Sequence, residues 1–192
     1  MKTLLENQLG SARSWPMNFK STAVVLSLLA LAVVSRAQAT DNRTPDVPAA
    51  LAVPDGNKVH FHAYGVGVQI YAWNATTTKW VFLAPEATLF DSDGNVVGTH
   101  FLDVALGLPE WESDSGSTVV GKRIAAATVD ATAIPWLLLL AVQTSGPGIF
   151  APTTYVQRVN TVGGLAPATP GTSNGQVARV AYAAEYFFFR AE

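Results

Sequence analysis

The sequence predicts an all-β fold, a single-domain antiparallel β-sandwich or barrel of roughly nine to ten short strands. Many short segments alternate polar with apolar residues and are rich in Val, Ile, Tyr, Phe and Trp, which pack well on a pleated surface. Clusters of Gly, Asn, Asp and Thr separate these segments at short intervals. No long stretch has the apolar period of an amphipathic helix, which argues against a helical or mixed fold.

The N-terminal residues 1–39 are predicted to be a signal peptide. A positively charged start at Met17 precedes an uncharged apolar stretch over residues 21–34, and Ala37-Gln38-Ala39 is a small-x-small cleavage motif. Because the residues before Met17 lack an apolar core of their own, we expect translation to start at Met17. The apolar stretch is too short to span a bilayer comfortably, so we expect a secreted protein of the extracellular space or cell wall, with no membrane partner after cleavage.

Residues 40–56 are predicted to form an extended lead-in to a β domain that covers residues 57–192. The lead-in contains three prolines and little periodicity, which disfavours a regular strand or helix. Its apolar side chains, Val47, Leu51 and Val53, are expected to pack on the β domain.

The strands of the β domain are predicted from residue alternation and from the turns between them. In chain order they are residues 58–64, 66–73, 79–83, the two arms of a hairpin over 87–101, 118–127, 136–142, 153–159 and 178–190. The hairpin is the clearest element, because its arms flank Asp93-Gly94-Asn95, and Gly and Asn accept the positive φ angles of tight turns.

Two predicted strands are expected to lie in the core. The wholly apolar run over residues 134–142 is bracketed by Pro135 and a Gly-Pro-Gly turn, which favours a core strand, with a short buried helix as the alternative. The last strand contains four adjacent aromatic residues, 186–189, which cannot all face solvent. We therefore expect this strand to cross the core.

The charge and the cysteine content exclude several classes of function. Four of the 12 Lys and Arg residues, but only one of the 14 Asp and Glu residues, lie within the first 39 residues, so the remaining domain is acidic. An acidic domain without a basic stripe argues against nucleic acid as a partner. The absence of cysteine excludes thiol nucleophiles, CxxC redox pairs and thiolate metal sites.

The three histidines are candidate metal ligands. His60 and His62 are two residues apart in a predicted strand, so both imidazoles are expected on one face of a sheet, where they could bind one metal ion. His100, at the end of the hairpin, would supply a third nitrogen, and Glu112 or Asp114 a carboxylate. The alternative is that His60 and His62 are polar residues on a solvent face. No cofactor other than such a metal ion is predicted.

Aromatic and acidic residues indicate a second kind of site. Trp73, Trp111 and Glu112 are candidates for binding a glycan or another small ligand, because an indole ring can stack on a sugar beside a carboxylate. Paired carboxylates next to a Trp also occur in glycosidases, but acidic residues in a surface turn are commoner. Asn42 and Asn74 each begin an N-x-Thr acceptor, which would lie on the surface if the host glycosylates secreted proteins.

Motifs of several enzyme classes are missing or incomplete. The run Asp91–Asn95 resembles a calcium loop only superficially, because its Gly is the fourth residue and a hairpin turn explains it better. There is no GxSxG motif, and Gly65-Val66-Gly67 lacks the third glycine and the following helix of a dinucleotide site. Serine hydrolase and nucleotide-dependent activities are therefore not expected.

Several of these segments together resemble the secreted fungal and bacterial family named domain of unknown function 3455. The resemblance runs from about Val47 to Arg190 and is carried by residues 67–71, 80–91, 98–100, 111–121, 134–138 and 157–164. It implies export and one compact domain. Some members are labelled malate dehydrogenase, an activity that the missing nucleotide fingerprint does not support. Relative to the family pattern, residues 102–110 look like an insertion or a gene-model error.

The sequence thus favours a secreted, non-catalytic protein that binds a glycan or small ligand, or serves as a surface protein without a discrete ligand. The alternative is a metal-dependent enzyme that uses His60, His62 and His100, with Glu112 as its base.

Overall fold

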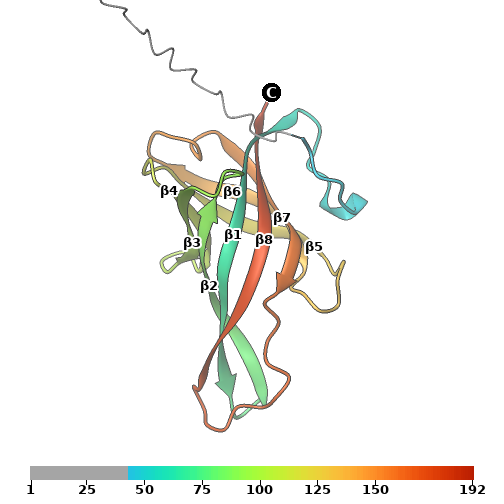
Figure 1. Ribbon diagram of the computed structural model, residues 1–192, viewed down its shortest axis with the longest axis vertical. Coiled ribbons are helices and arrows are strands. Elements are labelled where there is room, and N and C mark those ends of the chain that lie inside the picture. Colours follow the sequence, from blue (N-terminus) through green and yellow to red (C-terminus); the bar gives the residue numbers. More distant parts are fainter. Residues whose placement is uncertain (1–42) are drawn as a thin grey trace, which may run out of the picture. The chain divides into compact units, whose positions relative to one another are not determined.

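The computed structural model describes residues 43–192, which form a closed antiparallel β-barrel (Figure 1). In this part of the chain, eight strands follow one another around the barrel in chain order, and β1 pairs with β8 to close it. The strands are β1 (Asn57–Asn74), β2 (Lys79–Phe90), β3 (Val96–Asp103), β4 (Leu108–Ser113), β5 (Thr118–Ala127), β6 (Trp136–Ser145), β7 (Thr153–Gly163) and β8 (Val177–Ala191).

The all-β prediction is confirmed, and the architecture is the barrel rather than the sandwich. The predicted strand number is close. The predicted segments 58–64 and 66–73 form the single long strand β1, and the segment 79–83 and the first arm of the hairpin form β2, whereas β4 was not predicted. The predicted hairpin over 87–101 is present as β2 and β3, and Gly94 in its turn has a φ of 83°. The apolar run is confirmed as a strand, β6, and not a helix.

The N-terminal part of the chain is described from residue 43 onward. The predicted signal peptide, the start at Met17 and the glycosylation acceptor Asn42 lie outside the described residues. From residue 43 to the short helix η1 (Ala49–Leu51) and on to β1, the lead-in runs along the barrel, with Leu51 fully buried and Val53 packed on the outer face. No helix in residues 43–192 is long and apolar enough to cross a membrane.

Alternation along the strands separates an inner from an outer set of side chains. On β8, Tyr186 and Phe188 belong to the cluster inside the barrel, whereas Phe187 and Phe189 belong to a separate outer cluster. All four rings are buried, as the sequence predicts for a strand that crosses the core. Burial of each ring stabilises the fold by about 2 kcal/mol.

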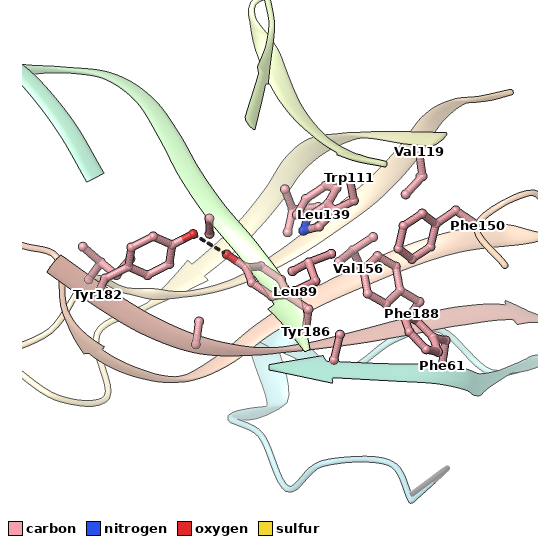
Figure 2. Packing of buried hydrophobic residues seen from close by; sticks show 14 residues of the cluster. Phe61, Leu89, Trp111, Val119, Leu139, Phe150, Val156, Tyr182, Tyr186 and Phe188 are labelled. Carbon is pink, nitrogen blue, oxygen red and sulfur yellow. Dashed lines mark hydrogen bonds between the residues drawn. The ribbon is translucent and has the colours of Figure 1, made fainter. Parts of the chain in front are cut away.

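One half of the barrel interior is filled by aromatic rings (Figure 2). The rings of Phe61, Phe150 and Phe188 contact one another, and their centroids lie 4.5 to 5.8 Å apart. Trp111 meets Phe188 edge-on at 6.0 Å. Phe150 comes from the loop between β6 and β7 and is fully buried, so this loop plugs one end of the barrel. We call this region the packed half.

Two strand glycines make room for large rings beside the packed half. A Cβ atom at Gly65 of β1 would lie 2.5 Å from the ring of Tyr186, and one at Gly121 of β5 would lie 2.9 Å from the ring of Trp111. Any side chain at these positions would displace the neighbouring ring. The two glycines therefore set how closely the rings of Tyr186 and Trp111 approach the barrel wall.

Candidate ligand-binding site

The other half of the barrel interior, which we call the open half, contains a cavity of about 360 Å³. Its floor is formed by the buried rings of His100, Trp111 and Tyr186. The walls are largely apolar and contain Phe82, Pro85, Leu102, Leu108, Pro109, Leu137 and Leu139. Because Phe82 is 47% exposed while the floor residues are buried, the cavity extends from the surface into the barrel. Its volume lies in the range of small-molecule sites.

Residues 102–110, predicted to be an insertion or a gene-model error, contribute Leu102, Leu108 and Pro109 to this wall. They comprise the end of β3, a four-residue turn and the start of β4, and Asp103 Oδ1 accepts a hydrogen bond from the Leu106 amide at 2.8 Å. Gly107 has a φ of 65°, a conformation that favours glycine. The turn is thus a regular hairpin connection, and Leu102 and Leu108 beside it face the cavity.

Three N–H donors on residues that line the cavity have no hydrogen-bond acceptor. They are Nε of Arg158, Nε1 of Trp111 and Nε2 of Gln69. Figure 2 shows the indole nitrogen of Trp111 on the side of the ring toward the hydroxyl groups of Tyr182 and Tyr186. A buried donor without an acceptor costs about 1–3 kcal/mol, and such groups are rare in native proteins. Their concentration on residues that line one cavity makes this cavity the candidate site.

Arg158 brings a positive charge to the cavity wall from β7. Its Nη2 donates a hydrogen bond to the Pro135 carbonyl oxygen at 2.8 Å, its guanidinium also hydrogen-bonds the Tyr186 hydroxyl, and the phenols of Tyr71 and Tyr182 lie nearby. Both side-chain ion pairs found within residues 43–192 involve other residues. Burial lowers the pKa of the Arg158 guanidinium, but an arginine stays protonated in proteins. Among residues 43–192 the charge therefore has no ion-pair partner.

The phenols beside Arg158 do not neutralise this charge. The hydroxyl groups of Tyr182 and Tyr186 share a hydrogen bond of 3.1 Å (Figure 2). Burial raises the pKa of both tyrosines above its ordinary value. Tyr71 donates its hydroxyl hydrogen to the Gly164 carbonyl at 2.7 Å, and burial raises its pKa as well. All three phenols are therefore uncharged at neutral pH.

His100 is a neutral imidazole in the floor of the cavity. Burial lowers its pKa to about 3, although the hydrogen bond to the Glu110 carbonyl acts in the opposite direction. Because a carbonyl oxygen can only accept, Nδ1 carries the proton of that 2.8 Å hydrogen bond, and Nε2 is the unprotonated nitrogen. The ring stacks on Trp111 at 4.4 Å with an interplanar angle of 7°. This stacking fixes the position of the indole.

The charged residues that line the cavity are all basic. They are Arg158, in the wall, and Lys122 and Arg123 of β5, which are exposed. No Asp or Glu lines the cavity. The cavity is thus locally positive in a chain whose formal net charge is −2.

The cavity lining contains few groups that could take part in chemical conversion. The lining contains no Ser, Thr, Asp or Glu to serve as a nucleophile or carboxylate base. His100, with a pKa of about 3, is a weak base at neutral pH. What the lining offers is apolar surface, unpaired N–H donors and positive charge.

The three predicted metal ligands do not lie together. His60 is the extra residue of a β-bulge in β1, and its Nε2 lies 3.3 Å from Thr153 Oγ1. His62 lies against Phe187 of the outer cluster and pairs with Glu185 at 3.0 Å, whereas His100 lies inside the barrel. Within residues 43–192 no group of three His, Asp or Glu side chains is placed to hold a metal ion. A metal site at these histidines stays a prediction, which this arrangement does not favour.

Of the predicted ligand-binding residues, only Trp111 lines the cavity. Trp73 packs edge-on against Trp80, and Gly171 lies so close that a Cβ there would contact its indole. Glu112 is exposed on β4, next to the buried Trp111. The acceptor Asn74 ends β1, where its Oδ1 accepts a hydrogen bond from the Thr77 amide at 2.9 Å. The glycosylation prediction is untested.

Sequence reasoning missed Arg158 and Gln69. Gln69 alternates with Tyr71 and Trp73 along β1, so a polar residue on an aromatic face was a readable signal. Arg158 had no such signal, because polar and apolar residues do not separate onto two faces around it. Its inward position follows from its alternation with Val156, which belongs to the interior cluster.

Comparison with known proteins identifies the family. The family DUF3455, described as "Protein of unknown function", matches residues 54–190, which includes all eight strands almost to their ends. The chain therefore belongs to this family, as the resemblance implied. The searches of curated proteins and of solved structures found no significant match.

Proposed function

We propose that this protein is exported and binds a small, largely apolar molecule in the open half of its barrel, without transforming it. The family to which this chain belongs is described without an activity, so the binding proposal rests on the structure. The observation that carries this proposal is the cavity of about 360 Å³. Protein interiors are close-packed, so a cavity of this size among leucines leaves apolar surface without contacts. A ligand would restore those contacts.

The form of the barrel supports the same proposal. A closed eight-stranded barrel has an interior just wide enough to be filled by side chains or to hold one small ligand. Here the packed half is filled by rings, whereas the open half is bounded by rings and left hollow. Export is supported by the leader pattern in residues 17–39.

Glycan binding, one of the expectations from the sequence, has less support. The lining residues of the cavity are mainly aliphatic, and sugar sites need several polar groups to satisfy the hydroxyls. Trp73 is 8% exposed and covered by the loop that contains Gly171, so it offers no free indole face of the usual kind.

The test is ligand binding by the secreted protein, measured by isothermal titration with the uncharged probe 2-naphthamide. The variant Leu137→Trp places an indole in the cavity and should weaken binding about tenfold or more. Leu140→Trp is the matched control, because Leu140 lies on the same strand but is 37% exposed and absent from the cavity lining. It should bind the probe as the unmodified protein does.

Circular dichroism and thermal unfolding check that both variants fold. If Leu137→Trp does not fold, Leu139→Phe replaces it, a smaller change in the same wall. Absence of binding by the unmodified protein, to this probe and to the carboxylates described below, would overturn the proposal. Equal weakening by Leu137→Trp and Leu140→Trp would do the same.

A further inference from the structure

We infer that the natural ligand of this cavity is an organic carboxylate whose anionic group binds Arg158 and whose apolar body lies among the leucines. This inference rests on the proposed function and adds the chemical class of the ligand. Its observations are the charge and the hydrogen-bonding groups of the open half, which are separate from the volume and shape of the cavity.

The first step of the argument is that the unpaired groups are all donors. Nε of Arg158, Nε1 of Trp111 and Nε2 of Gln69 each carry hydrogen and need an acceptor. A ligand hydroxyl or amine would bring a further hydrogen, whereas a carboxylate brings two oxygens that only accept. Among common ligand groups, a carboxylate matches this set best.

The second step is the charge that the fold leaves uncompensated. Arg158 is held by the neutral carbonyl of Pro135 and lies beside neutral phenols. The neighbouring Tyr182 and Tyr186 are hydrogen-bonded to each other and keep their protons. A partly buried charge is stabilised by an opposite charge, and none of the lining residues supplies one. The missing negative charge has to come from the ligand.

The third step concerns the kind of anion. A guanidinium binds a carboxylate with two parallel N–H···O bonds, and Nε is one of the donors that can form such a pair. Phosphate esters, with a second negative charge, are bound by larger sets of cations and backbone amides inside the site, whereas Arg158 is the one cation of this lining that is not exposed. The rest of the wall is leucine, proline and aromatic, so the body of the ligand is apolar.

The fourth step is the surface that a ligand crosses to enter. Lys122 and Arg123 line the cavity and are exposed. Two cations near the entrance attract anions from solution, and they repel cationic ligands. The two cations near the entrance and the charge of Arg158 inside therefore both favour a negatively charged ligand.

The experiment compares three probes of one shape by isothermal titration of the secreted protein: 2-naphthoate, 2-naphthamide and 2-naphthylmethanol. We expect 2-naphthoate to bind about 30-fold or more tightly than the two neutral probes. In Arg158→Gln this preference should disappear, because 2-naphthoate binding falls by that factor while neutral binding falls far less. Arg158→Lys should keep part of the preference, since it keeps the charge but loses the planar pair of donors.

Arg179→Gln is the matched control for loss of one positive charge. Arg179 lies on β8 in an exposed ion pair with Glu86 and does not line the cavity. It should keep the full preference for 2-naphthoate. Trp111→Phe removes one donor and keeps an aromatic ring, so it should weaken 2-naphthoate binding about threefold to tenfold.

The outcomes separate the two proposals. Equal affinity of the unmodified protein for 2-naphthoate and 2-naphthamide overturns the carboxylate inference and leaves the binding function standing. A preference that survives unchanged in Arg158→Gln also overturns it. If none of the three probes binds, and decanoate and decanamide do not bind either, both proposals are wrong. Should Arg158→Gln fail to fold, the comparison of Arg158→Lys with Arg179→Gln decides the matter.

Discussion

The packed half and the open half of the barrel are lined by the same strands, yet they are filled by different kinds of side chain. On β7, Val156 faces the packed half, and Arg158, two residues further, faces the cavity. On β8, Phe188 contacts other rings, and Tyr186 places its hydroxyl group next to that of Tyr182. On both strands, therefore, an apolar side chain in the packed half is followed or preceded, two residues away, by a polar side chain in the open half.

This difference is the one expected if the open half binds a ligand, as proposed, and the packed half stabilises the fold. The contacts among the rings of Phe61, Phe150 and Phe188 in the packed half contribute to stability and involve no polar group. In the open half, three unpaired donors and a charge without counterion lower the stability of the free protein. A protein that keeps such groups in its interior gives up stability where a ligand would bind.

The largest effect is expected in the packed half. Phe188→Ala removes a fully buried ring between Phe61 and Phe150 and should lower the free energy of unfolding by about 3–5 kcal/mol. Chemical denaturation measures it, with the exposed Val142→Ala as the control. If 2-naphthoate affinity fell as steeply in a folded Phe188→Ala protein, the division into two halves would be wrong.

The next effect is the acid sensitivity contributed by His100. Its pKa is about 3 in the folded protein because burial and the nearby Arg158 disfavour its charged form, and near 6.5 when unfolded. Below pH 6.5 the unfolded chain takes up a proton that the folded chain does not bind until about pH 3. As the pH is lowered from about 6.5 to about 3, the free energy of unfolding should therefore decrease, by up to about 1.4 kcal/mol per pH unit from His100 alone.

His100→Asn keeps a donor for the Glu110 carbonyl and cannot titrate, so its unfolding free energy should depend less steeply on pH between 6 and 4. Urea denaturation at several pH values gives both slopes. The pKa of His60 is also lowered, to about 4, by partial burial and by Arg190, so His60→Asn should change the slope in the same direction but less. Identical slopes for the unmodified protein and His100→Asn would contradict the buried, neutral assignment of His100.

The smallest effect is a gain in stability. Arg158→Met removes the uncompensated charge, fills part of the same space, and should raise the free energy of unfolding by about 1 kcal/mol, despite the lost bond to Pro135. The same variant should bind 2-naphthoate poorly. Urea denaturation and titration of one preparation measure both effects. A strong loss of stability in Arg158→Met would mean that Arg158 is a structural residue, and the contrast between the halves would weaken.

Most of the fold could be predicted from local patterns in the sequence. The turn residues Asp93-Gly94-Asn95 predicted the hairpin of β2 and β3, and Pro135 with the Gly-Pro-Gly turn predicted the limits of the strand β6. Both signals lie within short segments, and both elements are present. The closure of the barrel could not be predicted from the sequence. It depends on the pairing of β1 with β8, which lie at opposite ends of the domain sequence. A bulge at His60 also altered the alternation from which that strand was predicted.

The site was less predictable than the fold, because its residues are brought together by pairings between distant segments. Trp111 and His100 were singled out by residue type, and both lie in the cavity, although as stacked floor residues rather than as a glycan platform and a metal ligand. Arg158 sits beside Gln157, which faces outward and donates to the Leu51 carbonyl of the lead-in at 2.6 Å. Which of these two polar neighbours faces the interior is decided by long-range packing.

The pairing of β1 with β8 has a consequence for when the binding site comes into existence. Every other pairing joins strands that are neighbours along the chain, so those hairpins can form as soon as each pair has been made. Synthesis proceeds from the N-terminus, so the first strand has to wait for the last one. Before β8 is present there is an open sheet with two free edges and no enclosed cavity. A nascent chain, or one truncated before Val177, should therefore be unable to hold the proposed ligand, because the cavity is enclosed only in the complete barrel.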